Sequence, residues 1–203
     1  METRITIVKN YRNKETLRLL ELQALADAIS TGTYQEQVSE FRRIYPLMTY
    51  ADRRSDGTLE GYTNWPKELP RICFALEQEN RNGERLTRSY NGLVLLEVNN
   101  LTGQDEAEAV RRGAAEMPQT LMAFVGAEGQ SVKIVCRGEF FPQDNSASPT
   151  LLPVAADDIA LFHENLYERA RLTYNGQLGV TIEKLEPTTQ RVCYMSYVPQ
   201  LVY

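Results

Sequence analysis

The sequence predicts one α/β (α+β) domain in which a central mixed β-sheet is flanked by helices. Strand-like and helix-like segments alternate along the chain, which is typical of this class. The 203 residues are 42% hydrophobic, enough for one sizeable core. Residues 92–98 form a nearly continuous apolar run, as expected for a strand that is buried on both faces. We therefore expect a single domain over residues 1–203, with a helical N-terminal part and loop at 1–70 and a sheet-bearing core at 71–203.

The N-terminal part is expected to contain one strand and two helices. Weak alternation predicts a strand at residues 5–8, and a broad apolar face of leucines predicts a helix at 14–29. A second amphipathic helix is expected at 34–45. Residues 51–70 are rich in turn-forming residues and are expected to form a loop, with Trp65 folded over the surface.

The core is expected to begin with a hairpin and to continue with a βαβ unit. The hairpin joins strands near 72–76 and 86–90, and the Asn82-Gly83 pair marks its turn. The strand at 92–98 is followed by a helix at about 105–116, whose acidic first turn complements the helix dipole. Two further strands are expected at 121–125 and 132–136.

The C-terminal third is expected to form a connection, a long helix and two strands. Residues 141–152 are polar and contain proline, which predicts a connection. The helix should run from 154 to 175 and stop at Gly176. Strands are expected at 178–182 and 192–197.

The composition limits the class of function. Asp and Glu number 27 against 22 Lys and Arg, so the net charge of −5 disfavours a globally basic nucleic-acid binder. One hypothesis is a local strand-binding groove that is lined by arginines and in which aromatic residues stack on bases. The alternative, which the net negative charge favours, is a solvated surface with scattered cations. The candidate residues of the groove are Arg42, Arg43, Tyr50, Arg53, Arg54, Tyr62, Trp65, Arg81, Arg85 and Arg88.

Other classes are disfavoured by the residues present. Three widely separated cysteines form neither a disulfide framework nor a zinc ribbon. No segment approaches the length of a membrane span or resembles a signal peptide, so we expect a cytoplasmic protein without membrane contact. His163 is the single histidine, and a structural role within its helix is favoured over a catalytic one. The sequence contains no P-loop and no dinucleotide fingerprint.

The end of the strand at 92–98 carries the candidate chemistry. Glu97 and Asn99 are two residues apart and project to the same face of an extended strand. Paired carboxylates at this spacing can hold a divalent cation for phosphoryl transfer, but an amide brings no charge to offset that of a metal ion. The alternative is an ordinary polar strand end that leads into a turn.

Three segments together resemble one known family. They are Leu-Leu-Glu-Val-Asn-Asn-Leu at 95–101, Phe-Val-Gly-Ala-Glu-Gly-Gln-Ser-Val-Lys at 124–133 and Arg-Val-Cys-Tyr-Met-Ser-Tyr-Val-Pro at 191–199. With Lys-Glu-Leu-Pro at 67–70, they resemble the VirE-type N-terminal domain of bacterial mobile-element proteins. That family is related to archaeo-eukaryotic primase (PrimPol-like) cores, and the likeness spans about residues 4–203. The resemblance implies a primase-like core.

The resemblance also assigns residues to site positions. Glu97 and Asn99 occupy the two acidic positions of an Asp-x-Asp pattern, and Glu183 matches a third acidic position. A glycine-rich, phosphate-binding hairpin corresponds to Gly129, Ser131 and Lys133, and Arg191 is retained. Glu97 and Glu183 would then be the residual ligands of Mg²⁺ or Mn²⁺.

The departures from the family pattern favour lost catalysis. A two-metal site needs several well-placed carboxylates, whereas here Asn99 replaces one acid and Val198 another. The first hypothesis is a replication-associated nucleotide- or nucleic-acid-binding domain of a mobile element. Its partners would be single-stranded DNA or a nucleoside triphosphate, together with a helicase-like partner or downstream domain. An active Mg²⁺- or Mn²⁺-dependent nucleotidyltransferase and a structural or protein-interaction module without ligand remain alternatives.

Overall fold

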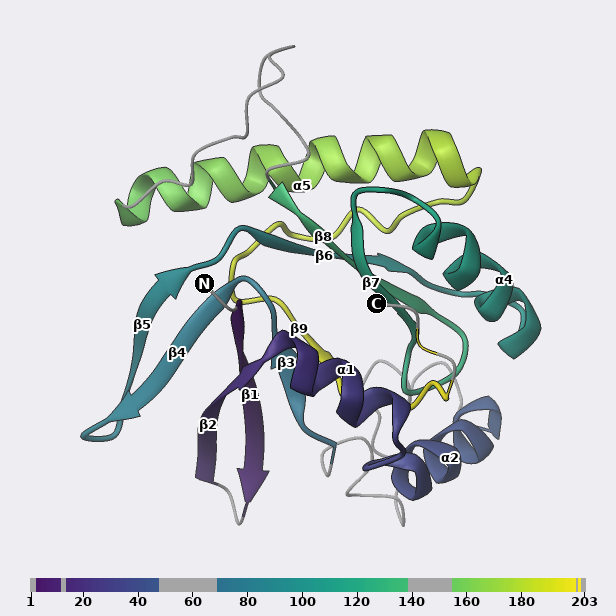
Figure 1. Cartoon of the computed structure of the whole chain (residues 1–203), viewed down its shortest axis with the longest axis horizontal. Coiled ribbons are helices and arrows are strands. Elements are labelled where there is room, and N and C mark those ends of the chain that lie inside the picture. The colour runs from purple at the N-terminus through teal and green to yellow at the C-terminus, as the bar shows by residue number, and fades with distance from the viewer. Residues whose placement is uncertain (1–2, 12–13, 48–68, 139–154, 200, 202–203) are drawn as a thin grey trace.

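The computed structural model describes residues 3–11, 14–47, 69–138, 155–199 and 201, and it shows a mixed α+β chain (Figure 1). The strands are β1 (Arg4–Tyr11), β2 (Lys14–Glu21), β3 (Arg71–Cys73), β4 (Leu76–Arg81), β5 (Glu84–Tyr90), β6 (Leu93–Val98), β7 (Thr120–Val125), β8 (Val132–Arg137) and β9 (Val192–Tyr194). The helices are α1 (Leu22–Ser30), α2 (Gln35–Ile44), the short 3₁₀-helix η1 (Tyr45–Leu47), α4 (Gln104–Ala115) and α5 (Ala156–Leu178). The α+β class predicted from the sequence is confirmed.

The described strands form three sheets rather than one central sheet. Their orders are β2-β1-β3-β9, β4-β5 and β6-β8-β7. Every hydrogen-bonded pair among these strands is antiparallel. In the third sheet β6 and β7 run in the same direction with β8 between them, so β6-α4-β7 is a split βαβ unit.

The expected helix at 14–29 is wrong in its first half. Residues 14–21 form β2, which pairs with β1 along its whole length, and only Leu22–Ser30 is helical. Leu17, Leu19 and Leu20 satisfy a helical pattern equally well, but in β2 they are only partly buried. Pairing with β1 supplies the backbone hydrogen bonds of this segment, and such tertiary pairing overrides a local helical preference. The second helix is confirmed as α2.

The predicted hairpin is confirmed at its turn. Asn82 and Gly83 both have positive φ, at 54° and 85°, as a two-residue hairpin turn requires. The expected strand at 72–76 is instead divided, because β3 ends at Cys73 and pairs with β1 and β9, whereas β4 begins at Leu76 and pairs with β5. The Thr6 hydroxyl connects the first two sheets: it donates to Leu76 O and accepts from Gln78 N, both at 2.8 Å.

The third sheet separates the long helices from the first sheet. On one side α4 packs against β7 and β8, and α5 packs against β6 (Figure 1). Thr120 connects the two helices of this side, because its hydroxyl lies 2.6 Å from both Ala114 O in α4 and the Tyr174 hydroxyl in α5. On the other side Phe124 contacts Phe74, which follows β3, with ring centroids 6.4 Å apart. One buried core includes residues of both layers.

Two predictions at the end of α5 are wrong. The helix continues through Gly176, whose Cα faces open space, and ends at Leu178 with Gly179 in a left-handed conformation at φ 64°. Residues 178–182 form no strand, because the Asn175 side chain caps the chain reversal by accepting from Ile182 N at 2.6 Å. The last strand is shorter than expected and ends at Tyr194.

Some expectations lie outside the described residues. They include most of the loop at 51–70 with Trp65, the connection at 141–152, and the groove candidates Tyr50, Arg53, Arg54 and Tyr62. In the described part of the chain, none of the helices combines the length and the apolar composition that crossing a bilayer requires.

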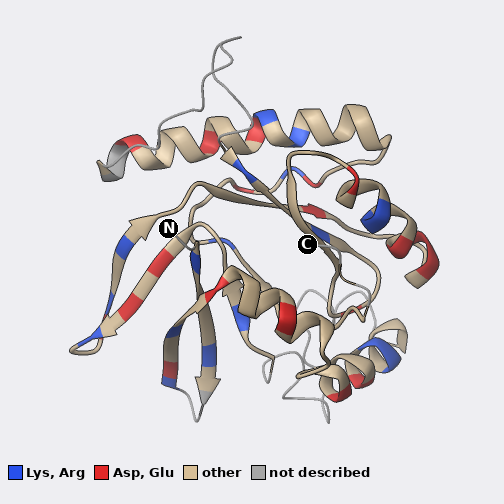
Figure 2. Cartoon of the chain, in the orientation of Figure 1, with Lys and Arg blue, Asp and Glu red and all other residues tan. Residues whose placement is uncertain are grey.

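Charged residues of both signs are interspersed along the described chain (Figure 2). On the β4–β5 hairpin, acidic residues of β4 lie beside basic residues of β5. The described surface of this hairpin is therefore mixed in sign rather than basic.

Candidate functional site

The centre of the candidate site is an ion pair across two neighbouring strands. Glu97 on β6 lies directly opposite Lys133 on β8, so their side chains share one face of the third sheet. Lys133 Nζ donates to Glu97 Oε2 at 2.6 Å. Only 11% of the lysine side chain and 12% of the glutamate side chain are exposed. Phe124 stands opposite Lys133 on β7, so this face is the one that faces the first sheet.

Three further predicted residues meet this pair. Arg191 Nη1 lies 3.9 Å from Glu97 Oε1, the carboxylate oxygen that does not accept from Lys133. Asn99 Oδ1 lies 3.5 Å from Lys133 Nζ, and Asn99 Nδ2 lies 3.5 Å from Glu183 Oε2. We call Glu97, Asn99, Lys133, Glu183 and Arg191 the polar cluster. The tertiary structure thus brings together five residues that span 95 positions of the chain.

The segment between α5 and β9 carries two members of the polar cluster, and Tyr167 of α5 positions it. Glu183 N donates to the main-chain oxygen of Glu97 at 2.8 Å, which attaches the segment to the free edge of β6. The Tyr167 hydroxyl donates to Glu183 O at 2.7 Å and accepts from Leu185 N at 3.2 Å. The Arg191 guanidinium lies over the Tyr167 ring, 6.0 Å from its centroid. Tyr167 was not predicted from the sequence, because one aromatic residue on a helix has no pattern of its own.

Two neighbouring carboxylates, that of Glu128 outside the polar cluster and that of Glu97 within it, keep Lys133 protonated. Burial of the ammonium acts to lower its pKa, but the carboxylates of Glu128 and Glu97 outweigh this effect and raise the pKa above its ordinary value. Glu128 belongs to the β7–β8 turn. The lysine therefore carries a positive charge at neutral pH inside a largely buried site.

The glycine-rich turn between β7 and β8 uses its polar groups internally. Gly126 N donates to Ser131 O at 2.8 Å, and Gly129 N donates to Gly126 O at 3.0 Å. The Ser131 hydroxyl donates to the Glu128 carboxylate. Gly129 has a φ of 82°, and a Cβ atom there would lie 3.2 Å from Arg42 Cγ. Gly129 and Ser131 therefore shape the turn and stand outside the contacts of the polar cluster.

Arg42 on α2 packs against this turn. Its Nη2 donates to Gly126 O at 3.2 Å, to Ser196 Oγ at 3.3 Å and to Tyr197 O at 3.1 Å. Burial lowers the pKa of Arg42, while the carboxylates of Glu128 and Glu108 oppose that shift. One guanidinium thus joins α2, the turn and the segment after β9. From the sequence, Arg42 was a candidate only for a surface groove.

Arg42→Met is expected to lower the free energy of unfolding by about 2 kcal/mol, because it leaves partly buried carbonyl acceptors without their charged donor. Urea denaturation monitored by circular dichroism measures this change. Arg43→Met on the same helix is the matched control, since Arg43 is exposed and pairs with Glu40 within one helical turn. Equal losses in the two variants would contradict the assigned role of Arg42.

The polar cluster does not fit a two-metal centre. Among the described residues no group of three or more His, Cys, Asp or Glu side chains is placed to ligate one ion. Glu97 Oε2 is in contact with the Lys133 ammonium, which also lies 3.5 Å from Asn99 Oδ1. The lysine thus occupies the position that a cation bound by Glu97 and Asn99 would take. A site built on Glu97 and Glu183 would have to displace this ion pair before it could bind Mg²⁺ or Mn²⁺.

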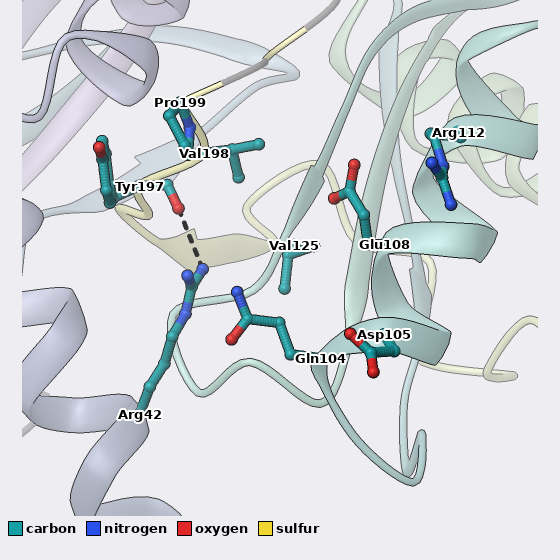
Figure 3. Close-up of a pocket in the computed structure, with 9 residues that line it drawn as sticks. All are labelled: Arg42, Gln104, Asp105, Glu108, Arg112, Val125, Tyr197, Val198 and Pro199. Carbon is teal, nitrogen blue, oxygen red and sulfur yellow. Dashed lines mark hydrogen bonds between the residues drawn. The ribbon is translucent and has the colours of Figure 1, made fainter.

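A pocket of about 250 Å³ opens beside Arg42, at the beginning of α4 and the end of β7 (Figure 3). Arg42 extends into it from α2, and Gln104 and Glu108 extend from α4 on the opposite wall. The Glu108 carboxylate also accepts from Arg111, at 2.6 and 2.9 Å. Val125, Tyr197, Val198 and Pro199 form the apolar part of the lining.

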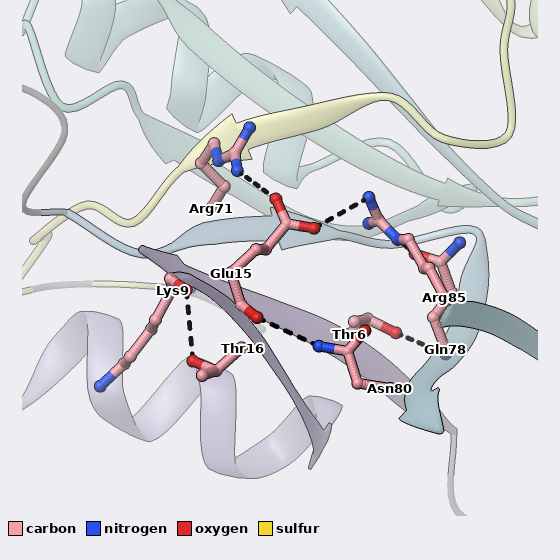
Figure 4. A network of polar contacts seen from close by, with 8 residues as sticks. All are labelled: Thr6, Lys9, Glu15, Thr16, Arg71, Gln78, Asn80 and Arg85. Atoms are coloured by element: carbon pink, nitrogen blue, oxygen red, sulfur yellow. Dashed lines mark hydrogen bonds and ion pairs between the residues drawn. The ribbon is translucent and has the colours of Figure 1, made fainter. Parts of the chain in front are cut away.

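Two of the hairpin arginines, Arg85 and Arg88, form ion pairs in the described structure, which agrees with scattered surface cations, the interpretation that the sequence favoured over a strand-binding groove. Arg85 Nη1 and Arg71 Nη2 both contact the Glu15 carboxylate, at 3.3 and 2.8 Å (Figure 4). Arg85 Nε also donates to Gln78 Oε1 at 3.0 Å, and Arg88 is paired with Glu79. These arginines connect β2, β3, β4 and β5 to one another.

The fold and the polar cluster define an α+β domain with a charge-compensated site at the carboxyl end of β6 and the amino end of β8. A family model described as the BT4734-like N-terminal domain matches residues 64–203. The chain therefore belongs to the family of BT4734-like N-terminal domains. Comparison with curated proteins and with solved structures found no match.

Proposed function

We propose that this domain binds nucleotides or single-stranded nucleic acid at the polar cluster and has lost metal-dependent catalysis. In this proposal it is a replication-associated domain of a mobile element whose primase-like site has become a binding site. One observation carries the proposal: the Lys133 ammonium lies 2.6 Å from Glu97 Oε2, where a catalytic cation would be needed. A resident ammonium can contact phosphate oxygens, but it cannot activate a nucleophile as a metal ion does.

The charges around the cluster predict weak, salt-sensitive binding. Lys133, Arg191 and the nearby Arg42 are opposed by Glu97, Glu128 and Glu183, so the local charge is balanced. A phosphate must compete with the Glu97 carboxylate for Lys133 and Arg191. Each cation that a phosphate neutralises adds to the salt dependence of binding.

This competition gives a test in which one substitution strengthens binding and another weakens it. Glu97→Gln removes the competing carboxylate and is expected to tighten the binding of a fluorescent single-stranded oligonucleotide about ten-fold at low salt. Arg191→Met is expected to weaken it by a similar factor. Fluorescence anisotropy measures both affinities. Arg18→Met is the matched control, because Arg18 is exposed on β2 and has no side-chain partner among the described residues.

The other two hypotheses make different predictions in the same experiments. If wild type and Glu97→Gln both fail to bind the oligonucleotide and a nucleoside triphosphate at low salt, the proposal is wrong and an interaction module is favoured. If wild type extends a primed template with Mn²⁺ and Glu97→Gln abolishes extension, the domain is an active nucleotidyltransferase. The proposal requires oligonucleotide binding without extension.

A further inference from the structure

The pocket beside Arg42 is a site separate from the polar cluster. Val125, the last residue of β7, lines the pocket, and its partner on β8 is Val132. Lys133 of the polar cluster follows Val132, and successive residues of a strand project to opposite faces of a sheet. The pocket therefore opens on the α4 side of the third sheet, whereas the polar cluster lies on the side of the first sheet.

One wall of the pocket carries a half-buried cation with unused donors. Arg42 Nη2 makes all of the hydrogen bonds that join its guanidinium to the described residues, with Gly126 O, Ser196 Oγ and Tyr197 O as acceptors. No described group accepts from its buried Nε. The guanidinium is thus held in place by one nitrogen and keeps donors for a further acceptor.

The opposite wall carries two carboxylates on one face of α4. Asp105 and Glu108 are three residues apart, so they lie next to each other on that face. Arg111 fixes Glu108 by donating to both of its oxygens, and only 3% of the Arg111 side chain is exposed. In the part of the chain that the structure describes, Asp105 has no side-chain partner, and no ion pair joins Glu108 to Arg42 across the pocket (Figure 3).

Positive and negative side chains balance each other in this lining. Arg42 and Arg112 carry two positive charges, and Asp105 and Glu108 carry two negative charges. A simple anion would meet the carboxylates, and a simple cation would meet the guanidinium groups. A small molecule that carries both charges suits both walls, because each of its charged groups meets one of opposite sign.

The rest of the lining is mainly apolar, and the pocket is small. Val125 and Val198 are buried, and Tyr197 and Pro199 add further carbon surface. A volume of about 250 Å³ is below the usual range for drug-sized ligands. The pocket therefore suits a molecule of few atoms with one short apolar part.

We propose that this pocket binds a free α-amino acid with an aliphatic side chain. Arg42 binds the carboxylate, because a guanidinium pairs with carboxylates through parallel N–H donors. Asp105 and Glu108 accept from the ammonium, and the aliphatic side chain contacts Val125 and Val198. No residue of the polar cluster takes part, so this site and the proposed function stand independently.

Isothermal titration calorimetry with the full chain tests this site, with L-leucine as the probe. Three analogues each lack one of the recognised groups: N-acetyl-L-leucine lacks the ammonium, L-leucinamide lacks the carboxylate and glycine lacks the side chain. Each analogue is expected to bind at least about ten-fold more weakly than L-leucine, because each leaves one part of the lining without its partner. These comparisons use the wild-type protein, so they do not depend on the folding of a variant.

Asp105→Asn is expected to weaken the binding of L-leucine about ten-fold, because it removes one of the two carboxylates that accept from the ammonium. The same substitution is not expected to weaken the binding of N-acetyl-L-leucine, which has no ammonium. Glu116→Gln is the matched control, since Glu116 is exposed at the end of α4 and does not line the pocket.

Three results would overturn this proposal. The first is that L-leucine fails to bind both in calorimetry and in a thermal-shift titration. The second is equal affinity for L-leucine and for the two analogues that lack a charge. The third is an equal effect of Asp105→Asn and Glu116→Gln on L-leucine binding. None of these results bears on oligonucleotide binding at the polar cluster, so the failure of this site would leave the proposed function intact.

Discussion

Lys133→Met is expected to lower the free energy of unfolding by roughly 3–5 kcal/mol, the usual cost of removing one partner from a buried ion pair. Methionine can retain much of the packing of the lysine stem, so the main change is the loss of the ammonium. Glu97 would then be a largely buried carboxylate whose nearest remaining cation, Arg191, is 3.9 Å away. Urea denaturation at neutral pH measures the loss.

A double variant distinguishes the uncompensated charge from a packing defect. Glu97→Gln combined with Lys133→Met removes both charges and is expected to recover most of the stability lost in Lys133→Met. Two losses that simply add would contradict a direct interaction between the two side chains. Arg18→Met is again the control for removing a cation, and surface substitutions of this kind usually change stability by less than about 0.5 kcal/mol.

Acidification is expected to destabilise the protein through His163, by roughly 3 kcal/mol between pH 6.5 and pH 4. The residue is 4% exposed, and its Nδ1 lies 3.0 Å from the Tyr90 hydroxyl. Burial of the ring, assisted by the positive charge of Arg191, lowers the pKa of His163 to about 4. The unfolded chain binds a proton below about pH 6.5, whereas the folded chain does not until about pH 4. The free energy of unfolding therefore falls as the pH falls through this interval.

Comparison with His163→Gln isolates this contribution from that of the carboxylates. Both proteins share every other titrating group, so the difference between their stabilities reports on position 163. That difference is expected to change by roughly 3 kcal/mol from pH 7 to pH 4, with wild type losing more. Parallel stability curves over this range would show that His163 does not remain neutral in the folded protein. The location of His163 on α5, buried beside Tyr90, agrees with the structural role favoured from the sequence.

Local patterns predicted the elements whose own residues dictate their conformation. The Asn82-Gly83 turn and the apolar run of β6 were both correct, because φ preference and continuous burial are encoded within a few residues. The predicted end of α5 was wrong, because a glycine can lie within a helix when later residues cap the helix better. Gly179, with the side chain of Asn175, provides that cap three residues beyond Gly176.

The hairpin of β1 and β2 shows the opposite case. Leu17, Leu19 and Leu20 fit a helix as well as a strand, and only the partner strand decides between them. The same limit applies to Tyr167 and Arg42. Each of them connects segments that are distant in the sequence, so no local pattern indicates their roles.

The sequence by itself determined the α+β class, the strand that carries Glu97 and leads into Asn99, and the five polar residues of the polar cluster. Only the tertiary structure decided how these residues are used. By placing β8 beside β6, it puts the Lys133 ammonium against the Glu97 carboxylate. Cross-strand register is a long-range property, and the energy of a buried charge depends on its nearest neighbours in space.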